Sequence, residues 1–179
     1  NEAVTSAGRN NEMAYQVAKA AKELKRDMET ALLSNVAKSA GNATTARKLG
    51  GCPTWYETNV DAASNGSGAG NGAIRTDGTQ RAFTEDQLKG ILVSCYNEGG
   101  NPNMIMVNAF NKQKLSGFTG GSTRFDAAED RRLITSIDVY ESDFGTMQVA
   151  PNRFIRGANG TSAKIGQDAH ILDMEYWAV

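Results

Sequence analysis

The chain has 179 residues, of which 40% are hydrophobic, and its 19 basic and 20 acidic residues leave a formal net charge of -1. This balance argues against a basic protein that coats nucleic acid or anionic membranes. No run approaches the ~20 apolar residues of a membrane span. With 19 glycines and no recognisable signal peptide, the composition predicts a soluble, intracellular, loop-rich protein of one domain, with or without an extended appendage.

The first element that the sequence predicts is a long helix from about residue 10 to residue 39. This stretch lacks Gly and Pro and is rich in residues of high helix propensity. Its apolar residues recur at spacings of three and four in one narrow stripe: Val17, Ala21, Leu24, Met28, Ala31 and Leu32. Gly41 is the expected stop. We expect the striped side to pack on something and the other side to be solvated or to meet neighbouring chains, with a coiled-coil dimer as the second choice.

A glycine-rich loop region follows over residues 41–83, and glycine is densest in residues 64–72. The glycines there produce a spelling close to GxGxxG. A phosphate-binding loop of that type lies between a strand and a helix, and the sequence predicts neither on its two sides. We therefore interpret this stretch as a loop and not as a phosphate site.

A second helix has a well-marked start at Thr84. Thr84 is the expected N-cap, Gln87 completes a capping box, and Phe83 and Leu88 occupy the hydrophobic-staple positions. The apolar face comprises Leu88, Ile91, Leu92, Cys95 and Tyr96. Gly99, Gly100 and Pro102 end the helix. Cys95 lies on the apolar face, so we interpret it as a small hydrophobe rather than a nucleophile.

Short strands and one more helix are predicted next. Residues 104–107 read as a fully buried strand, and residues 108–116 as a helix that Gly117 stops. Residues 133–140 alternate as in a strand. Residues 142–145 form a turn and residues 146–149 return, which together predict a hairpin. A last strand is expected over residues 170–179, and it must pair with an early element or with something outside this chain.

Candidates for chemistry are few. Asp173 and Glu175 would project from one strand face about 7 Å apart, but an exposed strand face is the commoner explanation of such a pair. His170 is the only histidine, and no GxSxG element accompanies it, so we interpret it as a structural or surface residue. Cys52 and Cys95 form no CxxC pair, and zinc sites need four clustered ligands. The sequence therefore predicts no catalytic, cofactor-binding or metal-ligating residue, and a protein that is not an enzyme.

Several stretches, in the same order along the chain, resemble tailed-bacteriophage major capsid proteins, which are also called major head proteins. The longest spans residues 23–35 and reads ELKRDMETALLSN. Further matches are Ala46-Arg47, Gly50-Gly51 with Trp55, Thr84-Glu85 with Leu88, residues 99–102 (GGNP), 114–118 (KLSGF), 139–145 (VYESDFG), 151–153 (PNR), and Leu172-Asp173. The series runs from about residue 8 to residue 179, and this collinearity is more specific than any single motif.

The resemblance implies the Hong Kong-type capsid fold, an α+β fold in which a long spine helix accompanies an axial domain with a central sheet. Residues 1–40 would hold the spine helix of a peripheral-like domain, and residues 41–83 the glycine-rich loop region. Residues 84–165 would form the axial-like domain, and residues 166–179 a strand returning to the peripheral-like domain. Such proteins have more chain at both ends, so we expect this chain to be a fragment of a longer protein.

The same resemblance implies a structural subunit of a phage or prophage icosahedral capsid, which self-assembles into hexamers and pentamers that enclose packaged DNA. The expected partners are other copies of the chain, with scaffolding and portal proteins as further candidates, non-specific proximity to DNA and no membrane. The expected location is the virion, and the host bacterial cytoplasm before assembly. The alternative is a non-enzymatic adaptor or scaffold protein that binds partners through the helix at residues 10–39.

Overall fold

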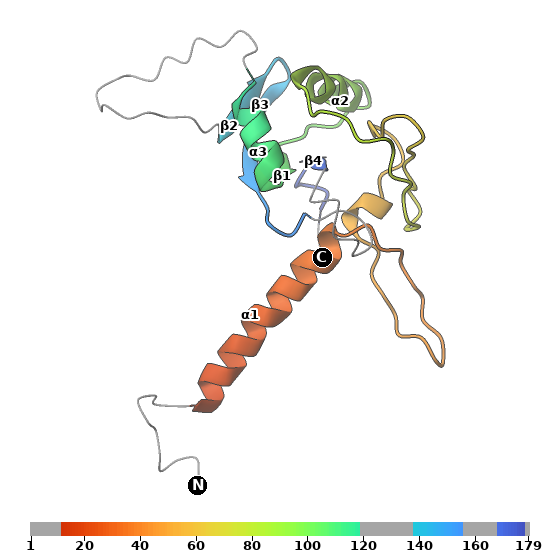
Figure 1. Cartoon of the computed structure of the whole chain (residues 1–179), viewed down its shortest axis with the longest axis vertical. Coiled ribbons are helices and arrows are strands. Elements are labelled where there is room, and N and C mark those ends of the chain that lie inside the picture. Colours follow the sequence, from red (N-terminus) through yellow and green to blue (C-terminus); the bar gives the residue numbers. More distant parts are fainter. Residues whose placement is uncertain (1–11, 119–137, 156–167, 178–179) are drawn as a thin grey trace, which may run out of the picture.

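The computed structural model describes residues 12–118, 138–155 and 168–177. Within these ranges the order of elements is α1, η1, α2, β1, α3, β2, β3, β4. Figure 1 shows α1 as a rod that projects from a body containing the strands and the other helices. The architecture is mixed α and β, as the sequence predicts.

The body is built on a four-stranded sheet with the strand order β2-β3-β1-β4. The strands are β1 (Met104–Val107), β2 (Val139–Ser142), β3 (Gly145–Pro151) and β4 (Ala169–Leu172). Strand β1 pairs in parallel with β3 and antiparallel with β4. Strands β2 and β3 are antiparallel, with Tyr140 opposite Met147. The predicted hairpin is therefore confirmed, and its returning strand runs on to Pro151.

Helices α2 (Glu85–Asn97) and α3 (Ala109–Ser116) begin where local side-chain chemistry places them. The Thr84 side chain accepts a hydrogen bond from the Gln87 N–H, and the Gln87 side chain accepts one from the Thr84 N–H. This is the predicted capping box, which satisfies two backbone donors that a helix start leaves without partners. Asn108 caps α3 in a similar way, because its side chain accepts from the Asn111 N–H at 2.8 Å.

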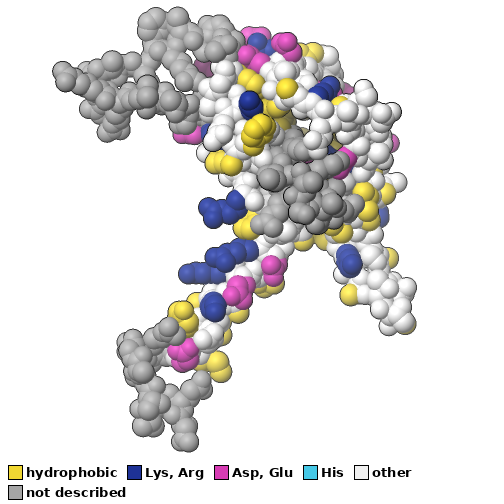
Figure 2. All heavy atoms as spheres, viewed as in Figure 1, with side chains coloured by type: hydrophobic (Ala, Val, Ile, Leu, Met, Phe, Trp, Pro, Cys, Tyr) yellow, Lys and Arg dark blue, Asp and Glu magenta, His cyan; other side chains and the backbone are white. Residues whose placement is uncertain are grey.

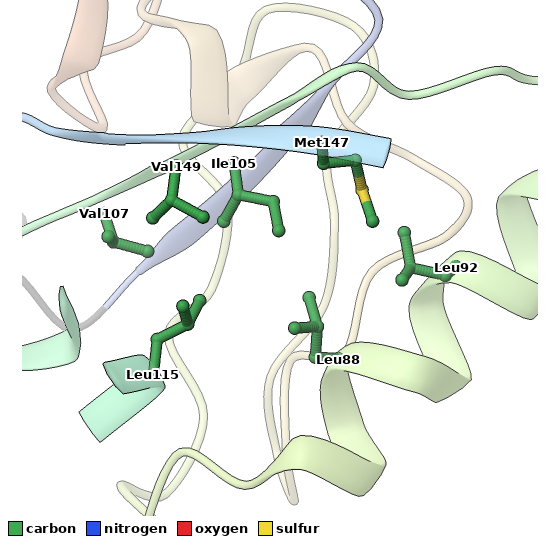
Figure 3. Packing of buried hydrophobic residues seen from close by; sticks show 7 residues of the cluster. All are labelled: Leu88, Leu92, Ile105, Val107, Leu115, Met147 and Val149. Atoms are coloured by element: carbon green, nitrogen blue, oxygen red, sulfur yellow. The ribbon is translucent and has the colours of Figure 1, made fainter. Parts of the chain in front are cut away.

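The hydrophobic core lies between these two helices and one face of the sheet (Figure 3). Its seven buried residues are Leu88, Leu92, Ile105, Val107, Leu115, Met147 and Val149. None is more than 3% exposed, and full burial of one such side chain stabilises the fold by roughly 1.5–3 kcal/mol. The core therefore fastens α2 and α3 to β1 and β3.

Strand β1 is buried on one face, whereas the sequence predicts burial on both faces. Ile105 and Val107 point into the core and are fully buried, whereas Met104 and Met106 point to the other face and are partly exposed. The prediction of a fully buried strand is therefore wrong. A continuous apolar run does not reveal that helices cover only one face of the sheet.

Helix α1 (Glu12–Leu33) ends six residues before its predicted end at residue 39. Two contacts distant in sequence explain this end. The Asn35 side chain donates to the Arg75 carbonyl at 3.0 Å and accepts from the Arg75 N–H at 3.1 Å. Beyond it the chain is not helical, and Lys38 donates its N–H to the Gly72 carbonyl at 2.8 Å. Gly41 is consequently not the helix stop but lies in a later turn, with φ at +75°.

Strand β4 is shorter than predicted and has a partner inside the chain. It ends at Leu172, and Tyr176 then donates its N–H to the Asp173 carbonyl at 3.2 Å, which closes a turn. The expected strand continuation through Met174 and Tyr176 is therefore wrong. Its partner is β1, in the middle of the sheet. Of the strand expected at residues 133–140, only Val139 and Tyr140 lie in a described strand, since residues 133–137 lie outside the described residues.

Residues 41–83 contain one short element, the 3-10 helix η1 (Cys52–Thr54), and two isolated bridge pairs involve this stretch. One bridge joins Ser39 to Lys48 and the other joins Ser67 to Thr76. Just before η1, Gly51 donates its N–H to the Val36 carbonyl at 3.1 Å. A Cβ atom at Gly51 would overlap the Ser34 carbonyl oxygen. The chain after α1 and the start of η1 are thus in direct backbone contact.

This contact yields a stability prediction. Gly51→Ala should lower the free energy of unfolding by about 1–3 kcal/mol, because a backbone carbonyl cannot yield to the added methyl group. Gly90→Ala is the matched control, since no described atom lies within 4 Å of a Cβ there. In the interior of α2 the same change should stabilise the protein by roughly 0.5–1 kcal/mol. Urea unfolding of both variants measures the difference, and equal effects would contradict the close approach at Gly51.

Candidate interaction surface

Most of helix α1 touches no other described part of the chain. Every residue from Met13 to Met28 is exposed, and Val17 and Leu24 keep 62% and 61% of their side-chain surface. At 1.5 Å per residue the 22-residue helix is about 33 Å long. The predicted apolar stripe is therefore present, and within the described residues nothing covers it from Val17 to Met28.

The last turn of α1 fastens the helix to the body. Leu33 is 5% exposed, and Glu29 accepts a hydrogen bond from the Asn152 side chain at 2.6 Å. Asn152 follows β3, and its own N–H donates to the Val107 carbonyl at 2.7 Å. The direction of the helix is thus tied directly to the two central strands of the sheet.

A buried polar cluster lies beside this attachment and joins η1 to β4. The Cys52 thiol lies 2.6 Å from the Tyr56 hydroxyl, which in turn lies 3.4 Å from Nδ1 of His170. The Tyr56 ring meets the Trp177 ring edge-on, with 5.9 Å between centroids. Burial raises the pKa of Cys52 to about 11 and also raises the pKa of Tyr56. Both groups are therefore neutral at physiological pH, and Cys52 is not an activated nucleophile.

An ion pair extends the cluster toward the residues before β4. The Arg75 guanidinium lies 2.6 Å from an Asp168 carboxylate oxygen and 3.1 Å from Asp77. Burial lowers the pKa of Arg75, but these two carboxylates outweigh it and the net shift is upward. Because Arg75 is also the backbone partner of Asn35, one residue connects the end of α1 to β4.

His170 is buried within this cluster and is only 2% exposed. Burial lowers its pKa from 6.5 to about 4, with Asp168 opposing the shift and Arg75 reinforcing it. No hydrogen-bond partner of Nε2 lies among the described residues. The imidazole is therefore neutral at pH 7, and of the two interpretations that the sequence allowed, the buried structural residue is the one observed.

The acidic pair considered from the sequence does not form. Asp173 directly follows β4, and its side chain accepts hydrogen bonds from the backbone N–H groups of Glu175 at 3.2 Å and Asn101 at 3.3 Å. Asp173 thus shapes a turn, and Glu175 does not share a strand face with it. Among the described residues no group of three or more His, Cys, Asp or Glu side chains could hold a metal ion.

The glycine-rich loop uses its backbone groups within the fold. Gly72 donates its N–H to the Thr54 carbonyl at 3.0 Å, and its carbonyl accepts from Lys38. Gly70 and Gly72 both adopt positive φ, at +69° and +80°. These glycines allow a tight path beside η1, where the N–H and the carbonyl of Gly72 both bond to other parts of the chain.

An open groove of about 330 Å³ lies where α1 meets the segment after β3. Its lining includes Lys25, Arg26 and Arg153, together with the bonded pair Glu29 and Asn152.

The described helices include none that is long and apolar enough to cross a membrane.

Sequence reasoning missed the residues that hold α1 in place. Asn35, Gly51, Tyr56 and Arg75 act through contacts with distant parts of the chain, and a local pattern does not indicate such contacts. Of these four residues, Asn35 and Gly51 lie within stretches that resemble capsid proteins, and this was the one sequence feature that could have indicated their importance. The exposed stripe itself was indicated by the 3-and-4 spacing of its apolar residues.

Two comparisons with known proteins bear on this surface. The family model described as SU10 major capsid protein matches residues 1–179. A search of curated proteins found no similar sequence.

The buried histidine predicts a pH dependence of stability. Because its pKa is about 4 in the folded protein and near 6.5 when unfolded, the unfolded state binds more protons between these values. Stability should therefore be fully present above pH 6.5 and fall as the pH drops toward 4, by up to about 3 kcal/mol. Urea unfolding of the wild type and His170→Gln from pH 7 to pH 4.5 measures it. A wild type that loses no more stability than the variant would contradict the assignment, since the chain has no other histidine.

Proposed function

Because the chain belongs to the SU10 major capsid protein family, we propose that it is a structural subunit of an icosahedral phage or prophage capsid with the Hong Kong-type fold. In this proposal its copies form hexamers and pentamers that enclose packaged DNA. Membership of the family by itself means that the chain is a structural subunit of a viral capsid, located in the virion, that associates with other copies of itself. The proposal adds the fold type, the symmetry and the contents of the shell.

The observation that carries the proposal is the uncovered stripe of α1. Helices in proteins gain most of their stability by packing an apolar face against a partner, not from helix propensity alone. The stripe has no cover within the described residues. Shell subunits need large surfaces that match other copies, and a helix held firmly at one end offers such a surface.

The chain divides naturally under this proposal. Helix α1 is the spine helix of a peripheral-like domain within residues 1–40, and residues 41–83 are the glycine-rich loop region. The sheet with α2 and α3 supports an axial-like domain over residues 84–165. Residues 166–179 return to the peripheral-like domain, and the contacts of β4 with both β1 and the α1 attachment are compatible with that role.

The remaining partners follow from the same proposal. Scaffolding and portal proteins are candidate neighbours, and subunits would wait in the host bacterial cytoplasm before assembly. DNA would be near the inner surface without specific binding. The proposal assigns the subunit a structural role and no catalytic, cofactor or metal site. The alternative is an adaptor or scaffold that binds a different protein through α1, and stoichiometry separates the two, because a shell protein is the most abundant component of its particle.

The assembly proposal predicts closed shells, or rings of five or six subunits, when the complete open reading frame is expressed in bacteria. Leu24→Asp should reduce the particle yield at least about tenfold, because a buried carboxylate costs more than the ~1.4 kcal/mol that a tenfold change requires. Leu49→Asp is the matched control, since Leu49 is 59% exposed and Leu24 61%. Negative-stain electron microscopy counts the particles.

Two outcomes would contradict this proposal. Wild-type subunits that stay monomeric at high concentration would favour the alternative function, an adaptor or scaffold that binds a different protein through α1. Equal loss of particles in both variants would show that any added charge blocks assembly, and that the α1 stripe has no special part in it.

The charge balance predicts weak binding to DNA. With a net charge of -1, the subunit lacks the excess of cations that makes affinity for DNA high and salt-dependent. Filter binding at low and moderate salt should therefore show little retention of duplex DNA. Tight retention that disappears on adding salt would contradict the proposal that DNA lies near the inner surface of the shell without being bound strongly by it.

A further inference from the structure

We propose that the basic side of α1, with the groove at its end, receives the acidic turn between β2 and β3 of a second copy of the chain. This inference rests on the proposed function and adds the identity of one contact between subunits. It concerns a side of α1 other than the apolar stripe. Three observations carry it: a line of cations that leads into the groove, a fixed acidic turn at the far end of the body, and the match between the two.

One side of α1 carries a line of basic side chains. Lys19, Lys22 and Arg26 follow spacings of three and four, which places them on one face of the helix. Lys25 lies beside this line, and all four residues are exposed. Figure 2 shows basic side chains along one flank of α1. This face therefore presents positive charge over about 10 Å of the helix axis.

The line of cations ends in the groove of about 330 Å³ beside the segment after β3. Lys25 and Arg26 line that groove together with Arg153, which is also exposed. The groove contains one carboxylate, Glu29, which accepts the hydrogen bond from Asn152. We call the five cations the basic strip: Lys19, Lys22, Lys25, Arg26 and Arg153. Among the described residues none of the five takes part in an ion pair, so the strip keeps an excess of positive charge.

The turn between β2 and β3 is the acidic counterpart. Glu141 and Asp143 are exposed there and take part in no ion pair among the described residues. Hydrogen bonds within the turn fix its shape. The Ser142 hydroxyl donates to the Gly145 carbonyl at 2.9 Å and accepts from the Phe144 N–H at 3.3 Å. The two carboxylates are therefore presented on a preformed element.

The surroundings of this turn are acidic as well. Burial raises the pKa of Tyr140, and Glu85 and Asp143 raise it further, which places both carboxylates near its ring. Asp86 is exposed in the first turn of α2. Lys89 is bonded to Glu85 at 2.9 Å. Figure 2 shows acidic side chains at the end of the body farthest from α1. A net charge of -1 thus hides two oppositely charged regions that lie at different ends of one chain.

The two surfaces also match in their apolar groups. The Phe144 ring of the turn packs on the Tyr96 ring, with 4.8 Å between centroids, and the two residues remain 38% and 59% exposed. Pro151 and Phe154 line the groove between its cations. An acidic turn that carries an exposed aromatic pair therefore complements the groove in charge and in hydrophobicity.

The charges around the strip favour a protein turn over nucleic acid. Glu23 and Asp27 are exposed on the neighbouring side of α1, and Glu29 lies in the groove. A phosphate backbone running past the helix would meet these carboxylates, whereas a compact turn can contact the cations alone. The chain also belongs to a family whose members associate with their own copies, and each copy supplies such a turn.

A contact between two different surfaces is heterologous. Each copy would use its groove toward one neighbour and its turn toward another, and such contacts close into a ring when the rotation between copies allows it. The charges select the partner and its orientation, since exposed ion pairs add little to affinity.

Charge reversal in the complete reading frame tests the pairing. Glu141→Lys with Asp143→Lys makes the turn basic, and Lys25→Glu with Arg26→Glu makes the groove acidic. Each double variant should lower the particle yield about tenfold, because like charges then meet in every contact. A chain with all four changes should regain most of the yield, because both surfaces are reversed together. Normal yield from either double variant, or no recovery with all four changes, would overturn the pairing.

A matched control separates position from net charge. The turn variant combined with Arg47→Glu and Lys48→Glu has the same net charge as the chain with all four changes, but its groove stays basic. Arg47 and Lys48 are exposed and do not line the groove. This control should keep the low yield of the turn variant, and its recovery would overturn the pairing. Unchanged thermal melting of the unassembled subunits checks that each variant is folded.

Cross-linking tests the contact without reversing its charges. A chain with both Asp143→Cys and Arg153→Cys should give a ladder of linked copies when its shells are treated with a short bifunctional thiol reagent. Asp143→Cys alone and Arg153→Cys alone are the controls and should give no ladder. Normal shells without a ladder would overturn the pairing and leave the capsid proposal intact, whereas absence of shells from the wild type would defeat the proposed function.

Filter binding with duplex DNA covers the competing ligand. The wild type should retain little DNA, and Lys25→Glu with Arg26→Glu should change this little. Retention by the wild type that is lost in this variant would assign the basic strip to nucleic acid and overturn the pairing.

Discussion

The last turn of helix α1 and the backbone that follows it set the geometry on which the rest of the molecule depends. Three chain segments meet there at backbone distance: the end of α1, the strand-like stretch through Val36 and Lys38, and the start of η1 at Gly51. Only glycine permits this approach, because any side chain at Gly51 would enter the space of the Ser34 carbonyl. The helix is thereby held at one end and left exposed along the remainder.

The polar residues around this attachment connect it to the sheet. Arg75 contacts Asn35 through its backbone and Asp168 through its side chain, so the end of α1 and the start of β4 share one partner. Tyr56 adds a second link from η1 to His170 in β4. Since β4 pairs with β1, the direction of α1 is transmitted to the central strand of the body. A rigid link of this kind suits a protein in which the placement of one copy determines the placement of the next.

Where local chemistry decides the structure, the sequence predicted it well. The capping box at Thr84 and Gln87 and the stop after Ser116 depend on neighbours within four residues, and both are present. The turn between β2 and β3 is likewise local. The apolar stripe of α1 was visible because its spacing is a property of the helix itself. The features that the sequence predicted are therefore the start of α2, the end of α3, the turn between β2 and β3, and the apolar stripe of α1.

Where distant contacts decide the structure, prediction from sequence failed. High helix propensity continues past Leu33, but the Asn35 side chain bonds both the N–H and the carbonyl of Arg75, forty residues away, and α1 ends before it. Alternating residues continue past Leu172, but the Asp173 side chain accepts from the Glu175 N–H and begins a turn. The place of β4 beside β1, and with it the burial of His170, depends on the whole topology. No pattern of spacing contains that information.

The central claim is that α1 is a docking element which becomes covered only between copies of the chain. Hydrogen–deuterium exchange on the complete protein, before and after assembly, tests it most directly. We expect the amides of residues 13–28 to exchange rapidly in unassembled subunits and slowly in shells, while those of β1 stay protected in both states. Protection of residues 13–28 equal to that of β1 in unassembled subunits, or unchanged exchange in shells, would contradict the claim.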